Sequence, residues 1–82
     1  MNINNTRIAI IGLGYVGLPL AVEFGKFFNV VGYDINEKRV DDLISGNDST
    51  LEVSKTELTN AKKLRYTSNI QDLVSSNCYI IT

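Results

Sequence analysis

The stretch Ile8-Ala9-Ile10-Ile11-Gly12-Leu13-Gly14-Tyr15-Val16-Gly17 decides the fold of this 82-residue chain. Its first part, residues 7–11, is β-branched and almost wholly apolar, which is typical of a parallel strand buried on both faces. Apolar residues then recur at helical spacing from Tyr15 to Phe24, and Gly25 is a plausible end of that helix. The sequence therefore predicts a strand, a glycine-rich turn and a helix in direct succession.

The glycines of the turn match the pattern G-x-G-x-x-G between the strand and the helix, which is the context that gives this pattern meaning. Gly12 would make the sharp turn, and Gly14 lacks a Cβ, so that a pyrophosphate could approach the backbone. Gly17 would let the helix pack closely on the strand. Phosphates would meet the free amides of Gly14, Tyr15 and Val16 at the helix N-terminus. The alternative is a tight turn that merely needs glycine.

Asp34 closes a second apolar strand, residues 30–33, about twenty residues beyond the first glycine, where a carboxylate can bind an adenosine ribose. Such a charge-assisted hydrogen bond contributes about 1.5–3 kcal/mol. The same carboxylate would repel a ribose 2′-phosphate by about 4 kcal/mol at 4 Å and an effective dielectric constant near 20. The sequence thus predicts NAD rather than NADP as cofactor, and the alternative role for Asp34 is a helix cap.

Two cations follow directly, Lys38 and Arg39. They could host a phosphate, or they could form an ordinary solvated helix face. We expect a mixed arrangement, in which Arg39 lies close to the adenosine end of the cofactor and Lys38 faces water. The candidate cofactor-binding residues are Gly12, Leu13, Gly14, Tyr15, Val16, Gly17, Asp34 and Arg39.

Two further helices are expected after the second strand. The first runs from about Asn36, which can cap it, to Gly46. A polar, loop-like stretch over residues 47–53 follows. Ser54 and Glu57 then have the spacing of a capping box, which opens a helix through Leu64.

The last part of the chain predicts a weak strand at residues 65–67, a short helix capped by Ser68 with Gln71, and a buried strand at residues 78–82. Strands and helices alternate throughout, which favours an α/β fold with an open parallel sheet and right-handed crossovers. Four strands in the order 3-2-1-4 form about half of a doubly wound, Rossmann-type domain. We therefore expect residues 1–82 to be the N-terminal part of a longer NAD-binding domain.

Composition excludes several other classes of protein. The net charge of −1, from eight Lys and Arg against nine Asp and Glu, argues against non-specific nucleic-acid binding. Without His, and with Cys78 in an apolar strand, neither a zinc site nor a cysteine nucleophile is expected. No apolar run is long enough for a membrane span, and the polar start at residues 1–6 is unlike a signal peptide, so a cytoplasmic chain is expected. No catalytic group is expected within the chain.

The run from Ile8 to Ala21, with Gly-Tyr-Val-Gly-Leu-Pro at its centre, resembles the start of the UDP-glucose/GDP-mannose dehydrogenase family. The resemblance continues through residues 31–36 and Arg39 and, less sharply, through residues 78–82. Thr50-Leu51-Glu52 is more similar to the branch that oxidises UDP-N-acetylhexosamines for surface polysaccharides than to UDP-glucose dehydrogenases.

That resemblance implies an enzyme that oxidises the C6 alcohol of a UDP-sugar to a carboxylate in two steps with two NAD⁺, using a cysteine nucleophile and a lysine beyond Thr82. It also implies a homodimer. By motif position, Tyr15, Val16, Asp34 and Arg39 are its NAD contacts. Two alternatives remain open, namely another NAD-dependent dehydrogenase of the 3-hydroxyacid type and a non-catalytic NAD-sensing module.

Overall fold

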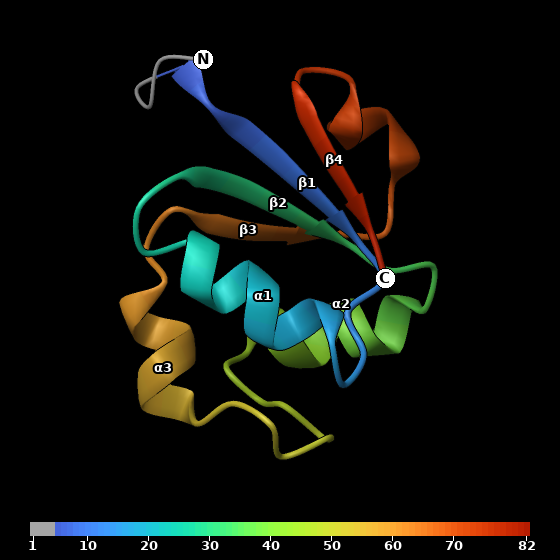
Figure 1. Ribbon diagram of the computed structural model, residues 1–82. Coiled ribbons are helices and arrows are strands. Elements are labelled where there is room, and N and C mark those ends of the chain that lie inside the picture. Colours follow the sequence, from blue (N-terminus) through green and yellow to red (C-terminus); the bar gives the residue numbers. More distant parts are fainter. Residues whose placement is uncertain (1–4) are drawn as a thin grey trace.

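A computed structural model describes residues 5–82 of the chain. Its centre is one parallel sheet of four strands in the order β3-β2-β1-β4, as predicted (Figure 1). The strands are β1 (Arg7–Ile11), β2 (Asn29–Tyr33), β3 (Leu64–Thr67) and β4 (Cys78–Ile81). In this order β1 lies between β2 and β4, so the turn that follows β1 stands at the point where the strand order reverses. In open α/β sheets that point is where ligands bind.

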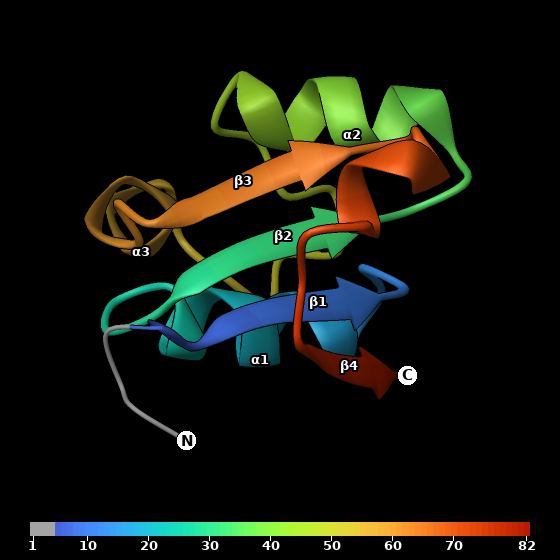
Figure 2. The same cartoon turned by 90° about the horizontal axis from the view of Figure 1, so that it is seen from above.

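The helices cover the two faces of the sheet unequally. Helices α1 (Gly17–Phe24) and α2 (Glu37–Ile44) lie on one face, and the short α3 (Lys55–Asn60) lies near the amino end of β3 (Figure 1). The 3-10 helix η2 (Ile70–Leu73) crosses the opposite face, as the view in Figure 2 shows. No helix within residues 5–82 is long and apolar enough to cross a membrane. Residues 1–4, part of the polar start considered above, lie outside the described residues.

Apolar burial follows this division into two faces. The main core lies between the sheet and the helices α1, α2 and α3. Its buried members include Ile8, Ile10, Leu13, Leu18, Ala21, Val22, Val30, Leu43, Val53 and Leu58. A smaller cluster of Ala9, Val31 and Leu73 lies under η2 on the opposite face. Cys78 packs against the main core, as its sequence context predicts.

Two of the predicted helix starts are confirmed in detail. The Asn36 side chain accepts a hydrogen bond from the Arg39 N–H at 3.2 Å and so caps α2. Ser54 and Glu57 form a reciprocal capping box at the start of α3, with Ser54 Oγ accepting from the Glu57 N–H at 3.1 Å. These caps satisfy amides that have no partner within the helix.

Three predicted boundaries are wrong. Helix α1 begins at Gly17 rather than Tyr15, because the two preceding residues belong to the turn. Helix α3 ends at Asn60, since Leu64 is already paired with Val30 as the first residue of β3.

The third error concerns the cap of the short helix. It is Asn69, and not Ser68, whose side chain accepts from the Gln71 N–H at 3.0 Å. Gln71 is the second residue of this 3-10 helix, and an N-cap side chain accepts from the second or third amide, so Asn69 is the cap and Ser68 lies outside the helix.

The prediction of a buried last strand is correct for only one of its two faces. Burial alternates along β4, where Cys78 and Ile80 pack against the main core and Tyr79 and Ile81 are 51% and 78% exposed. The reason is the cover on the second face. Within the described residues η2 is the helical cover on that side, and one four-residue turn does not reach across all four strands.

Candidate functional site

The glycine turn joins the carboxyl end of β1 to the start of α1. Gly12 has φ +101°, a conformation that favours glycine, and its N–H donates to the Tyr33 carbonyl at 2.8 Å. A Cβ on Gly17 would lie 1.7 Å from the Gly12 carbonyl oxygen. These two glycines are therefore required by the turn itself, and they bring the first turn of α1 against the end of β1.

Gly14 differs from these two glycines. A Cβ built on it would meet no atom within 4 Å, so the space next to this residue is open. Within residues 5–82 the amides of Gly14, Tyr15 and Val16 have no protein acceptor, and no side chain caps α1 at Val16. Free amides at a helix N-terminus beside open space suit an anion such as a pyrophosphate. The residues present thus fit the phosphates of a dinucleotide.

The peptide groups of Leu13 are held from both sides. Its N–H donates to Asp34 Oδ2 at 3.0 Å, and its carbonyl oxygen accepts from Arg39 Nε at 2.9 Å and from Nη2 at 2.6 Å. The side chain is fully buried, and its Cδ2 lies close enough to β2 that a Cβ on Gly32 would be 2.8 Å away. Leu13 therefore fixes the turn to the sheet and leaves the next three amides unengaged.

Asp34 stands at the end of β2 beside the turn. Its second oxygen, Oδ1, accepts from the Asn36 N–H at 2.9 Å. Since Asn36 is the cap of α2, the alternative role of Asp34 as the helix cap is wrong. The carboxylate lines a shallow cleft of about 240 Å³ together with the glycine turn and Thr82.

Thr82 is a member of this cleft that the sequence did not single out. Its hydroxyl donates to the carbonyl oxygens at the end of β1, with Oγ1 3.1 Å from the Ile11 oxygen and 2.9 Å from the Gly12 oxygen. The residue follows β4, which pairs with β1 in register up to Ile81. That parallel pairing brings Thr82 beside the turn. Its place in the cleft could therefore be predicted only from the strand order, because a threonine at this position has no distinctive sequence pattern.

Arg39 lies next to the turn, and its guanidinium is engaged by protein groups. Besides binding the Leu13 carbonyl, it pairs with Asp48, with Nη1 and Oδ1 2.7 Å apart. The Arg39 and Asp48 side chains are only 10% and 0% exposed. Lys38, in contrast, is 83% exposed and pairs with Asp42 on the surface of α2, which confirms that it faces water.

Asp48 was not predicted as a site residue. It accepts five hydrogen bonds, from Arg39, from the Thr50 N–H and hydroxyl, and from the N–H groups of Glu52 and Val53. Burial alone would raise the pKa of Asp48, but the hydrogen bonds from Thr50, Arg39 and Val53 outweigh it and hold the pKa well below its usual range. An Asp before Ser and Thr in a polar loop signals a local turn, and it gives no indication of Arg39.

Tyr66 on β3 is affected by the same ion pair. Burial, the largest influence, raises the pKa of Tyr66 to about 12, with the nearby Arg39 opposing this rise and Asp48 adding to it. Its phenol therefore stays neutral at physiological pH.

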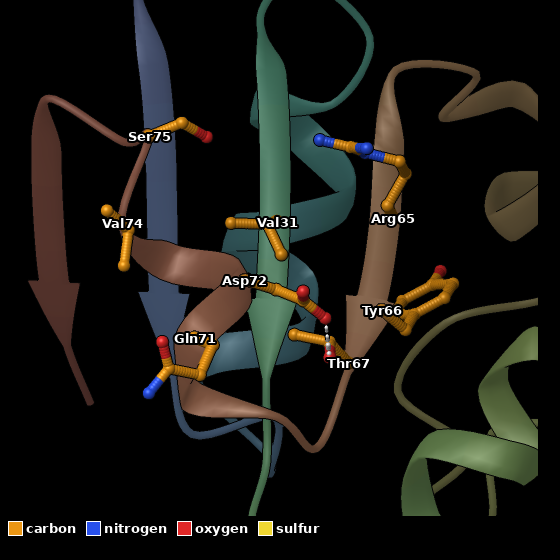
Figure 3. Close-up of a pocket in the computed structure, with 8 residues that line it drawn as sticks. All are labelled: Val31, Arg65, Tyr66, Thr67, Gln71, Asp72, Val74 and Ser75. Atoms are coloured by element: carbon orange, nitrogen blue, oxygen red, sulfur yellow. Dashed lines mark hydrogen bonds between the residues drawn. The ribbon is translucent and has the colours of Figure 1, made fainter.

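A second cavity of the described residues lies elsewhere. It measures about 440 Å³ and is on the face opposite α1, between β3 and η2 with Val31 at its floor (Figure 3). Asp72, one of its lining residues, accepts a hydrogen bond from the Thr67 hydroxyl (Figure 3). The chemistry of free amides and a carboxylate favours the smaller cleft at the glycine turn as the functional site.

The fold and this cleft define a dinucleotide-binding domain of the Rossmann type. A family model described as the NAD binding domain of the UDP-glucose/GDP-mannose dehydrogenase family matches residues 6–82. The chain therefore belongs to the UDP-glucose/GDP-mannose dehydrogenase family, as the NAD-binding domain of that family.

Individual relatives agree with this assignment. The chain is 57% identical over 76 residues to UDP-N-acetyl-D-glucosamine 6-dehydrogenase of Pseudomonas aeruginosa, a match that covers 93% of this chain and 18% of that protein. It is 55% identical over 80 residues to the Salmonella typhi protein of the same name, covering 98% of this chain and 19% of that protein. The chain thus spans about a fifth of the length of the curated relatives it matches.

A solved structure, that of UDP-D-ManNAc dehydrogenase from Pyrococcus horikoshii, superposes with a TM-score of 0.77 at 36% sequence identity. The superposition covers 94% of this chain and 20% of that one.

Proposed function

We propose that this chain is the cofactor-binding, N-terminal part of an enzyme that oxidises the C6 alcohol of a UDP-N-acetylhexosamine to a carboxylate with two NAD⁺. The observation that carries the proposal is the row of three free amides beside Asp34 at the start of α1. The names of the similar proteins, which are UDP-N-acetyl-D-glucosamine and UDP-N-acetyl-D-mannosamine dehydrogenases, support the choice of sugar.

Each part of the cleft has a role in this proposal. The amides of Gly14, Tyr15 and Val16 bind the pyrophosphate, and the open face of Gly14 lets it approach. Asp34 accepts hydrogen bonds from the adenosine ribose. Arg39 supports the turn through the Leu13 carbonyl. When bound, NAD⁺ supplies the hydride acceptor for the alcohol.

The chain contributes binding in this proposal, and the chemistry comes from the remainder of a longer protein. Cys78 lies half-buried in β4 against the core, and a role as nucleophile is not proposed for it. In this proposal the reacting cysteine and lysine lie in the part of the longer relatives' sequence that these 82 residues do not span. We also propose that the complete protein is a homodimer, which light scattering would test. Its product would serve the synthesis of surface polysaccharides.

The activity is tested on the complete, purified protein. It is incubated with NAD⁺ and, separately, with UDP-N-acetylglucosamine, UDP-N-acetylmannosamine and UDP-glucose, and NADH is followed by its absorbance. The proposal expects two NADH per sugar oxidised and a preference for an N-acetylated sugar. Binding of NAD⁺ without turnover of any UDP-sugar would contradict the activity while leaving the cofactor site intact.

A further inference from the structure

Arg39 presents a problem for cofactor choice. It directly follows the ribose-binding segment, and an arginine in that region of Rossmann-type domains accommodates the 2′-phosphate of NADP. Its guanidinium also lies at the glycine turn, on the Leu13 carbonyl. A free guanidinium here would attract the 2′-phosphate that Asp34 repels.

The structure shows that this guanidinium is not free. Its Nε and Nη2 both donate to the Leu13 carbonyl, and its Nη1 donates to Asp48 Oδ1 at 2.7 Å. With 10% of its side chain exposed, Arg39 has little room to turn outward. Three of its five N–H groups are engaged by protein acceptors, and to turn outward to a ribose phosphate the side chain would have to leave both of them.

The surroundings of Asp48 keep its carboxylate in place to pair with the Arg39 guanidinium. Its carboxylate is fully buried, and four of its five hydrogen bonds come from the loop at Thr50, Glu52 and Val53, so its position does not depend on Arg39. Moving Arg39 away would leave a buried carboxylate without its cation, which is strongly unfavourable. Among the described residues no buried side-chain N or O atom lacks a hydrogen-bond partner, so the present arrangement is complete.

We propose that Asp48 is a specificity-determining positioning residue, which holds Arg39 on the Leu13 carbonyl and withholds it from a ribose 2′-phosphate. The preference for NAD over NADP then depends on two carboxylates, Asp34 at the ribose and Asp48 behind Arg39. This inference rests on the proposed NAD site. It adds a residue from the loop after α2 that does not touch the cofactor.

The test compares Asp48→Asn, Arg39→Gln and the double variant in the complete protein, with NAD⁺ and NADP⁺ affinities measured by calorimetry. Asp48→Asn keeps the shape of the side chain and removes its charge. We expect it to shift the ratio of the two dissociation constants toward NADP⁺ by about tenfold, the scale of one charge-assisted hydrogen bond. In the double variant this shift should disappear, because the released cation is gone.

Asp42→Asn is the matched control, since Asp42 also pairs with a cation of α2 but leaves Arg39 untouched. It should not change the ratio. Equal weakening of both cofactors by Asp48→Asn would overturn the inference, because a merely structural role in the loop predicts that result.

The variant Arg39→Gln keeps Asp48 and the four loop groups that donate to it. It therefore tests the inference even if Asp48→Asn does not fold. We expect it to weaken NAD⁺ and NADP⁺ by the same factor. A selective loss of NADP⁺ would show that Arg39 already reaches the phosphate, and the inference would be wrong. Failure of the proposed site is recognised separately, since Asp34→Ala would then leave both affinities unchanged.

Discussion

The carboxylate of Asp34 accepts a hydrogen bond from the backbone N–H of Leu13 at 3.0 Å, across 21 positions of sequence. This contact joins the end of β2 to the middle of the glycine turn. It means that the residue expected to bind the ribose also holds the loop expected to bind the pyrophosphate. A substitution of Asp34 therefore affects both ends of the proposed site.

Replacing Asp34 with Ala in the complete protein should weaken NAD⁺ more than NADP⁺. The change removes a ribose acceptor contributing about 1.5–3 kcal/mol, and it also removes the repulsion of the 2′-phosphate. Calorimetric titration with each cofactor measures the two affinities. Asp41→Ala, an exposed position on α2, is the control and should change neither. Equal loss of both cofactors with Asp34→Ala would contradict the ribose role.

Replacing Gly14 with Val should abolish cofactor binding and leave the fold nearly unchanged. The new side chain would enter open space, where a Cβ meets no atom within 4 Å, and would occupy the place of the pyrophosphate. Circular dichroism and cofactor titration separate the two effects. Unchanged NAD⁺ affinity would argue against the phosphate site.

Replacing Gly17 with Ala is the contrasting experiment on the same turn. Its Cβ would lie 1.7 Å from the Gly12 carbonyl oxygen, so the backbone would have to move. We expect loss of stability on the scale of a severe overpacking mutation, about 1–3 kcal/mol or more. Chemical denaturation of the complete protein measures it, and a stability within error of the wild type would show that the turn is looser than the structure indicates.

Acid should weaken the fold through Asp48. Its pKa is held below the ordinary value of 3.8, so its contribution to the free energy of unfolding is fully present above that pH. It is lost as the pH falls from 3.8 toward the lower folded-state pKa. Thermal unfolding at several pH values below 4 should show a smaller acid-induced decline in Asp48→Asn than in the wild type. Parallel declines in the two proteins would contradict this assignment.

Replacing Asn69 with Ala should destabilise the start of η2 by about 0.5–2 kcal/mol, the usual cost of losing a helix cap. The neighbouring substitution Ser68→Ala should stay within about 0.5 kcal/mol of the wild type. The difference follows from the hydrogen bond between the Asn69 side chain and the Gln71 N–H. Hydrogen exchange of the η2 amides compares the two variants, and equal protection in both would show that Asn69 is not the cap.

Much of this protein follows from local sequence. The glycine spacing, the apolar strands and the capping residues Asn36 and Ser54 each act within a few positions, so they predicted most elements and three free amides at one helix start. The strand order followed from the doubly wound topology that such alternating elements adopt. Where helical periodicity and strand pairing predicted different structures for one residue, strand pairing determined the outcome. Leu64 fits the periodicity of α3, yet it lies in β3 because Val30 of β2 pairs with it.

The remainder was decided by contacts between distant segments, which no local pattern encodes. Parallel pairing of β4 with β1 brings Thr82 to the turn. Asp48 and Arg39 look like surface charges in the sequence, but they form a buried ion pair, and Arg39 donates from it to the Leu13 carbonyl. A charged residue in a polar loop has the same sequence signature whether it is solvated or buried. The sequence alone thus determined that a cofactor turn exists, and the tertiary structure decided which side chains hold it, because ion pairing in the interior depends on what the fold brings within reach.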